Sequence, residues 1–213
     1  MKYKNCQSGY TLMEAIMFIA LISVVAVAIV STTSKMFHRY KVSRATSQVV
    51  EIQRSIAKRF AASPSYAKLT TTLIKREKLL PPDVYWKNNS AYHKLGGTIV
   101  ISNQYQGNVS GTGSYSHYVN DAGTGTTHQL DADQNNVFTI TFNGLNKNDC
   151  MELAVINWDG IEYSRLITIK INTGKTFFWQ DYGGKYNMLP ITMAKAKSAC
   201  NKAKGNKIRW AFL

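Results

Sequence analysis

Glycine and proline are both absent from residues 10–63 of this 213-residue chain. These two residues most often end or kink a helix, so their absence allows one unbroken helix across the whole segment. At 1.5 Å per residue, such a helix would run roughly 75–80 Å. Pro64 follows Ser63 and ends it, because the residue before a proline is pushed out of helical geometry.

Acidic residues are scarce. The chain has 12 Asp and Glu against 26 Lys and Arg, which gives a formal net charge of +14. A basic surface attracts anionic partners such as nucleic acid, lipopolysaccharide or phospholipid headgroups. Because the lysines are scattered along the sequence, we favour a role in solubility and subunit spacing, and an anionic surface or DNA is the alternative.

Motifs that carry catalysis or metal binding are missing. Residues 172–176 read NTGKT, but Ile169 stands where a phosphate-binding loop requires glycine. The histidines lack metal-ligand spacing, and residues 131–136 depart from a calcium loop because Asn136 stands where that loop has glycine. We therefore expect a protein that is not an enzyme and that holds no cofactor and no metal.

A second long apolar run is also absent. The first, up to Val30, is about 20 residues long and is enough to cross a hydrocarbon core of about 30 Å. Residues 9–14 read GYTLME, so Glu14 lies inside this run, where a charge is costly and rarely accidental. Lys2 and Lys4 precede the run and hold that end in the cytoplasm. Gly9 lies at the start of the run and marks a candidate cleavage site, so the apolar run would follow the cut. A secretory signal has the reverse order, with its apolar part before the cleavage site.

The character of the segment changes along its length. Residues 10–30 are apolar on all sides, which suits lipid or the core of a helix bundle. Residues 31–63 are amphipathic, because apolar residues recur at three- and four-residue steps and share one face. That face comprises Val42, Ala45, Val49, Ile52, Ile56 and Phe60. We expect it to pack on a globular head formed by residues 64–213.

Strand patterns dominate the head. Strands are predicted at residues 98–102, 137–142, 166–171, 176–179 and 207–212, and short helices at 65–80, 151–156 and 191–202. Asn172 to Lys175 form a turn between two of the strands. Residues 104–129, rich in Gly, Ser, Thr, Asn and Tyr, predict a long exposed loop or irregular hairpin. Tyr105, Tyr115 and Tyr118 there belong either to a binding surface or to a loop without a partner.

Cysteine is rare as well. Cys6 precedes the candidate cut after Gly9, which leaves Cys150 and Cys200 as an even pair in the exported part. An even pair in an oxidising compartment predicts one disulfide. It would close a loop of about 50 residues and stabilise the head by roughly 2–4 kcal/mol. Two buried free thiols are the alternative.

The GYTLME sequence followed by an apolar run resembles the processing motif of prepilins. The later part of the chain is more weakly similar to type IVb pilins. This resemblance implies an α+β pilin fold, with a long N-terminal α-helix packed on an antiparallel β-sheet head that has a C-terminal disulfide loop. It divides the chain into a leader (residues 1–9), the helix (10–63) and the head (64–213).

The resemblance also implies how the chain is processed and assembled. Prepilin peptidase cuts after the motif glycine, here Gly9, and methylates the new amino terminus, here Tyr10. The carboxylate of Glu14 then pairs with the amino terminus of a neighbouring subunit and sets the register of a homo-oligomeric filament. The chain would pass from the inner membrane, through an assembly platform, to an extracellular pilus.

Two features depart from the family pattern. The leader is short for a type IVb pilin, and Tyr10 replaces the usual Phe, Met or Leu. Minor pilins and type II secretion or competence pseudopilins share the motif, although the cysteine pair favours a pilin over a major pseudopilin. The sequence also leaves open a membrane-anchored periplasmic binding protein or enzyme, and a DNA-binding pilin. Adhesion, conjugation, motility and DNA uptake all fit the sequence.

Overall fold

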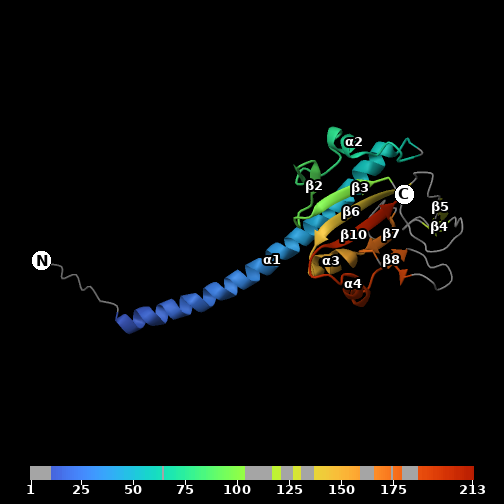
Figure 1. Cartoon of the computed structure of the whole chain (residues 1–213). Coiled ribbons are helices and arrows are strands. Elements are labelled where there is room, and N and C mark those ends of the chain that lie inside the picture. Colours follow the sequence, from blue (N-terminus) through green and yellow to red (C-terminus); the bar gives the residue numbers. More distant parts are fainter. Residues whose placement is uncertain are drawn as a thin grey trace. The chain divides into compact units, whose positions relative to one another are not determined.

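The computed structural model describes residues 11–63, 65–103, 117–120, 127–130, 137–158, 166–173, 175–178 and 187–213. The chain divides into two compact units, residues 1–40 and 41–213. Helix α1, Leu12–Phe60, begins in the first unit and ends in the second (Figure 1). The long N-terminal helix predicted by the sequence is therefore confirmed.

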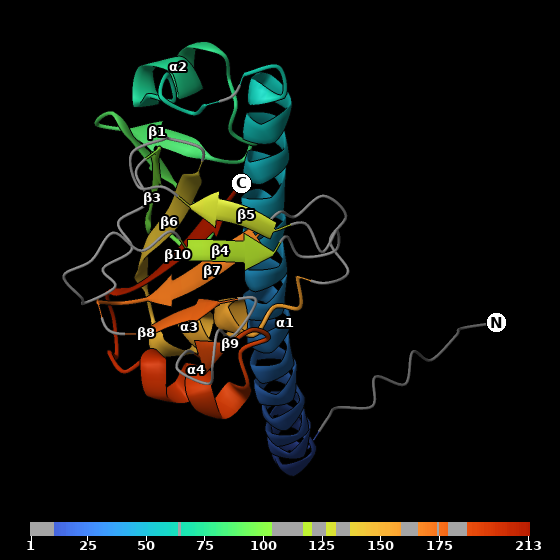
Figure 2. The ribbon, with the colours of Figure 1, turned by 90° about the vertical axis from the view of Figure 1, so that its right-hand side faces the viewer.

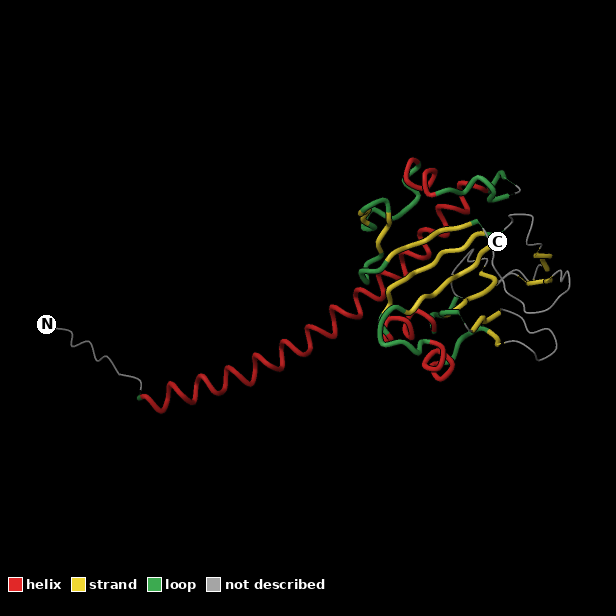
Figure 3. The backbone as a smooth tube through the Cα atoms, in the orientation of Figure 1, coloured by secondary structure: helices red, strands yellow, loops and turns green. Residues whose placement is uncertain are grey.

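A sheet of eight strands forms the centre of the second unit, as the tube in Figure 3 shows. Its spatial order is β1-β2-β3-β6-β10-β7-β8-β9, and all neighbours pair antiparallel except β8 and β9. The strands are Tyr85–Lys87 (β1), Ser90–Tyr92 (β2), Thr98–Ser102 (β3), Phe138–Leu145 (β6), Leu166–Ile171 (β7), Lys175–Phe178 (β8), Asn187–Met188 (β9) and Asn206–Phe212 (β10).

Smaller elements complete the second unit. Three short helices are α2 (Thr71–Arg76), α3 (Lys147–Ala154) and α4 (Met193–Ala199). Strands β4 (His117–Asn120) and β5 (Thr127–Leu130) pair antiparallel in a sheet of their own, inside the region for which an irregular hairpin was one prediction. Tyr105 and Tyr115 lie outside the described residues.

The core lies between α1 and one face of the sheet, which Figure 2 shows edge-on beside the helix. All six residues of the predicted apolar face of α1, Val42 to Phe60, are buried. They share one cluster with alternate residues of β6 and β10: Phe138, Ile140, Phe142, Ile208, Trp210 and Phe212. Each such side chain contributes about 1.5–3 kcal/mol through removal from water. The apolar residues that recur every 3.6 positions in α1 and every second position in the strands thus form one core.

Ion pairs fix the docked half of α1 at its edges. The Arg44 guanidinium donates to both oxygens of Asp83, from Nε at 2.7 Å and Nη2 at 2.9 Å, and its Nη1 contacts Glu51 Oε1 at 2.6 Å. Burial alone would raise the pKa of Asp83, but hydrogen bonds, chiefly from Arg44, outweigh it and lower that pKa. Arg59 pairs in the same way with Glu77, beyond α2.

The second helix is shorter than predicted: α2 starts at Thr71, whereas the sequence pattern suggested a start at Ser65. Tyr66 explains the difference, because its ring packs between Phe60, at 5.2 Å, and Phe138, at 4.8 Å, and holds the preceding segment out of a helix. Thr70 then caps α2 by accepting a hydrogen bond from the Leu73 amide at 3.1 Å.

The β1–β2 hairpin was not predicted. Its two-residue turn consists of Asn88 and Asn89, which both have positive φ values, 48° and 60°. Asparagine tolerates this left-handed geometry better than other residues with side chains, and two such residues form the turn that matches the twist of a hairpin. The Asn-Asn pair between two aromatic-containing triplets was the signal for it.

A buried histidine joins the β2–β3 turn to β6. His93 is 1% exposed and stacks on Phe142 with ring centroids 4.4 Å apart. Its Nε2 donates to the Asn143 carbonyl at 3.0 Å, while its Nδ1 accepts from the Leu95 amide at 3.3 Å. Both ring nitrogens are thus used in the neutral form, and burial lowers the pKa of His93 to about 4. A Cβ on Gly97 would lie 1.8 Å from the Asn143 oxygen, so only glycine fits there.

The lowered pKa of His93 predicts a loss of stability in mild acid. The unfolded state takes up a proton near pH 6.5, whereas the folded state takes one up only near pH 4. Between these values the unfolded chain binds more protons, so stability falls as the pH falls. We expect the free energy of unfolding, measured by urea titration with tryptophan fluorescence in mild detergent, to drop by about 2 kcal/mol from pH 7 to pH 5. His93→Gln should abolish this drop and His38→Gln should keep it; a drop that survives His93→Gln would contradict the assignment.

Candidate assembly site

The first turn of α1 places one carboxylate at the beginning of the helix. The amides of Glu14 and Ala15 donate to the Thr11 carbonyl at 3.0 and 3.2 Å, which starts the helical hydrogen-bond pattern. Glu14 is exposed and lies in this first turn, where the helix dipole favours a negative charge. Thr11 and Glu14 also have the T-x-x-E spacing of a capping box, a helix-start signal that the sequence analysis missed. Gly9 and Tyr10 lie outside the described residues.

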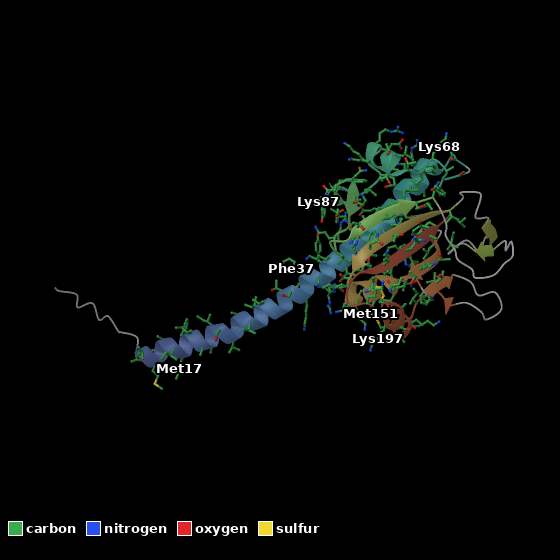
Figure 4. All side chains as sticks on the ribbon, viewed as in Figure 1. Met17, Phe37, Lys68, Lys87, Met151 and Lys197 are labelled. Atoms are coloured by element: carbon green, nitrogen blue, oxygen red, sulfur yellow. A yellow bond between two sulfur atoms is a disulfide. The ribbon has the colours of Figure 1, made fainter. Side chains whose placement is uncertain are left out.

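Before and after Glu14, large apolar side chains surround the helix. Figure 4 shows them projecting from its surface, with Met17 labelled. Those between Leu12 and Val30 have exposed fractions from 51% to 81%. They are Leu12, Met13, Ile16, Met17, Phe18, Ile19, Leu21, Ile22, Val24, Val25, Val27, Ile29 and Val30. An apolar surface of this extent marks a site of contact with protein or lipid.

Three hydroxyl groups on or just beyond this surface bond within the helix. Ser23 Oγ donates to the Ala20 carbonyl at 2.7 Å, Thr33 Oγ1 to Ile29 at 2.8 Å and Ser34 Oγ to Val30 at 3.0 Å. Such bonds back to the preceding turn let a hydroxyl lie in apolar surroundings without an unsatisfied donor. Glu14 is the one charged residue among residues 11–34, so its carboxylate is the group that must find a partner when this surface is covered.

Within the part of the chain that the structure describes, no helical stretch meets the combined length and apolarity of a membrane span.

The other predicted pair lies in the head, where a disulfide joins α3 to the end of α4. Cys150 and Cys200 have an S–S distance of 2.03 Å and a Cα–Cα distance of 5.9 Å, and neither is exposed. The predicted disulfide is therefore present, and the alternative of two free thiols is not. The bond ties the segment that enters β10 to the helix that follows β6.

Two asparagines reinforce this junction. The Asn206 amide, fully buried, donates to the carbonyls of Leu145 (3.3 Å) and Lys202 (2.6 Å), and its oxygen accepts from the Lys202 amide at 3.2 Å. Asn172 Nδ2 donates to the Ala199 carbonyl at 2.8 Å and to Asn206 Oδ1 at 3.1 Å. The two side chains thus satisfy the backbone of the turn between α4 and β10. This network gives no local signal in the sequence, because its partners lie far apart in the chain.

The described residues contain no candidate cluster for a metal ion. No group of three or more His, Cys, Asp or Glu side chains there is arranged to hold a metal ion. Residues 131–136, which begin like a calcium loop, lie outside that part. Trp158 and Trp210 are core residues, 2% and 0% exposed.

Comparison with known proteins gives a family match. The model of the Bundlin family matches residues 37–213. A type IVb pilin from Salmonella typhi is similar in structure, with 18% sequence identity and a TM-score of 0.41 over 81% of this chain and 97% of that one. TcpA, a type IV pilin from Vibrio cholerae El Tor biotype, has 11% identity and a TM-score of 0.43, covering 82% and 99%. No curated protein sequence matches the chain.

The asparagine network makes a prediction about stability. Asn206→Ala removes four hydrogen bonds, among them the one to the carbonyl of the buried Leu145. We expect a loss of roughly 2–4 kcal/mol in the free energy of unfolding, measured by urea titration without reductant. Asn201→Ala is the control, because this exposed residue makes one long contact at 3.3 Å and should cost less than about 1 kcal/mol. Equal losses would show that the buried amide does not stabilise the junction.

Proposed function

This chain belongs to the Bundlin family, a family of type IVb pilins, and on that premise we propose that it is made as a prepilin, processed after Gly9 and polymerised through α1. Its role is that of a pilus structural subunit, in a filament on the cell surface. The observation that carries the assembly step is Glu14, the one charged residue on a helix segment whose large apolar side chains are exposed.

The proposed processing follows from the residues around the cut. Gly9 lets an extended backbone enter a protease site without a side chain. Removal of residues 1–9 makes Tyr10 the amino terminus, one helical turn before Glu14. The three parts of the chain then have separate roles. The leader serves secretion, the helix of residues 10–63 serves assembly, and the head of residues 64–213 forms the outer surface of the filament. Before assembly, residues 10–30 would hold the subunit in the inner membrane, where prepilin peptidase and the assembly platform act on it.

Covering the apolar surface drives polymerisation in this proposal. Residues 10–30 of many subunits bundle together, and each apolar side chain that leaves water contributes about 1.5–3 kcal/mol. A carboxylate inside such a bundle is strongly disfavoured unless it is paired. The positive amino terminus of a neighbouring subunit, on Tyr10, supplies the opposite charge for Glu14.

The mass of sheared surface material tests the processing. We expect a species that starts at Tyr10, one methyl group heavier than the bare chain and two hydrogens lighter because of the disulfide. Gly9→Val should block the cut, because a side chain would fill the protease site, and should leave full-length chain with the cells. A wild-type mass confined to the membrane fraction at full length would contradict processing and favour a membrane-anchored binding protein.

Replacement of the carboxylate tests the assembly step. Glu14→Ala should still be cleaved, because the cut lies before it, but it should yield at least about tenfold less sheared filament, since about 1.4 kcal/mol per contact already gives that factor. Ser23→Ala is the matched control on the same surface: its hydroxyl bonds within the helix, so filament yield should stay normal. A normal yield of filament from cleaved Glu14→Ala would rule out the pairing of Glu14 with a neighbouring amino terminus. The proposed cleavage after Gly9 would not be contradicted by that result.

A further inference from the structure

The positive charge of the head is concentrated at its disulfide-stapled end. Lysines are scattered along the whole sequence, but residues 182–213 contain no Asp or Glu at all. Five lysines lie on α4, on the turn that follows it and at the start of β10, and all five are exposed. These five residues, Lys195, Lys197, Lys202, Lys204 and Lys207, are named the basic patch here. Figure 4 labels Lys197 at this end of the head, close to Met151 of α3.

The backbone beneath the basic patch is held rigidly. The disulfide fixes Cys200 at the end of α4, and Asn172 and Asn206 bind the carbonyl of Ala199 and both backbone groups of Lys202. The Lys207 amide donates to Asn172 Oδ1 at 3.0 Å. Three of the lysines therefore project from a turn that is fixed before any partner arrives. Preorganisation of this kind reduces the ordering cost of binding.

The ion pairs that the structure shows among the described residues lie away from the basic patch. They join Arg44, Arg59 and Arg76 to acids near α1 and α2. The carboxylates of the nearest helix, Asp149 and Glu152, are buried and half-buried. Like charges held close together repel one another, so a rigid lysine cluster costs stability unless a partner supplies negative charge.

Within the part of the head that the structure describes, a second copy of this chain offers no fully exposed acid for that role. Among the described residues of the second unit, 41–213, the acids are Glu51, Glu77, Asp83, Asp149 and Glu152, and all five are half-buried or buried residues. Three of them already pair with arginines. The charge of the chain is +14, so copies repel rather than attract through this surface.

The residues in and around the basic patch indicate which kind of polyanion it would bind. Single-stranded nucleic acid is bound by aromatic side chains on which bases stack, and residues 193–207 contain no aromatic residue. A membrane-surface helix needs a broad apolar face, whereas the inward residues of α4 are the small Ala196 and Ala199, both buried. Lysines on a rigid turn instead match the contacts that proteins make to the phosphates of a duplex.

We propose that the basic patch binds the phosphate backbone of double-stranded DNA, without reading its sequence. The lysines replace condensed counterions, so affinity falls steeply as salt rises. This property belongs to the head and does not require the filament, although a filament would repeat the patch many times and raise the apparent affinity.

Binding of a fluorescent duplex of mixed sequence to the full chain in non-ionic detergent tests the proposal. The patch variant carries Lys195→Gln, Lys197→Gln, Lys202→Gln and Lys204→Gln. The matched control removes the same charge from exposed lysines elsewhere, with Lys58→Gln, Lys68→Gln, Lys78→Gln and Lys94→Gln. Anisotropy titrations between about 50 and 200 mM salt give both the affinity and its salt dependence.

The two variants should differ sharply. We expect the patch variant to bind at least about tenfold more weakly and the slope of log K against log salt to fall by about 2–4, near one per phosphate-contacting lysine. The control variant should weaken binding less than about threefold, because it lowers only the net positive charge that attracts DNA to the whole chain. The double variant Lys202→Gln with Lys204→Gln, compared with Lys68→Gln and Lys78→Gln, repeats the test with α4 untouched.

Three outcomes would overturn the proposal. Equal losses in the patch and control variants would show that only net charge matters. Absence of duplex binding by the wild-type chain at about 50 mM salt, where such contacts are strong, would exclude DNA. Binding to heparin or to anionic lipid vesicles, but not to the duplex, would assign the patch to a different polyanion.

Discussion

The packing of the last turns of α1 on the inner face of the sheet is the contact on which the rest of the head depends. A six-residue face of the helix, from Val42 to Phe60, supplies one side of the core, and alternate residues of β6 and β10 supply the other. The two central strands come from distant parts of the chain, and they align only when their inward side chains have a common surface to cover. Arg44, bound to Asp83 and Glu51, then fixes how the helix lies along the head edge.

The C-terminal strand needs a second constraint because its partners are remote. β10 is the last element of the chain and inserts between β6 and β7, which are separated from it by helices and turns. Cys200 and Asn206 flank the turn that leads into it, and their contacts reach back to α3 and to the end of β6. The disulfide reduces the conformational freedom of the unfolded chain. The buried amide of Asn206 forms hydrogen bonds to backbone groups of the turn in the folded state. The two devices act on different states and therefore complement each other.

Local periodicity was enough to predict the long helix, the β3 and β7 strands at their observed bounds and most of β6 and β10. It failed where one long-range contact overrides local preference: Tyr66, packed between Phe60 and Phe138, keeps residues before Thr70 out of α2. Periodicity did not predict the β1–β2 hairpin, because its strands are short and its turn depends on positive φ values at Asn88 and Asn89. The roles of Asn172 and Asn206 could not be predicted at all, since an amide side chain gives no periodic signal and its partners are known only after folding.

A helix that is apolar on every side raises a problem of specificity. Burial of such a surface is favourable but non-directional, so two parallel copies can slide past each other by a turn with little change in buried area. The hydroxyls of Ser23, Thr33 and Ser34 do not help, because they already bond to their own helix. One carboxylate changes this, because a buried charge is tolerated only opposite a positive group. If the apolar segment supplies the energy of assembly, then Glu14 is the group within residues 11–34 able to select a single register, as isolated polar groups do in other helical assemblies.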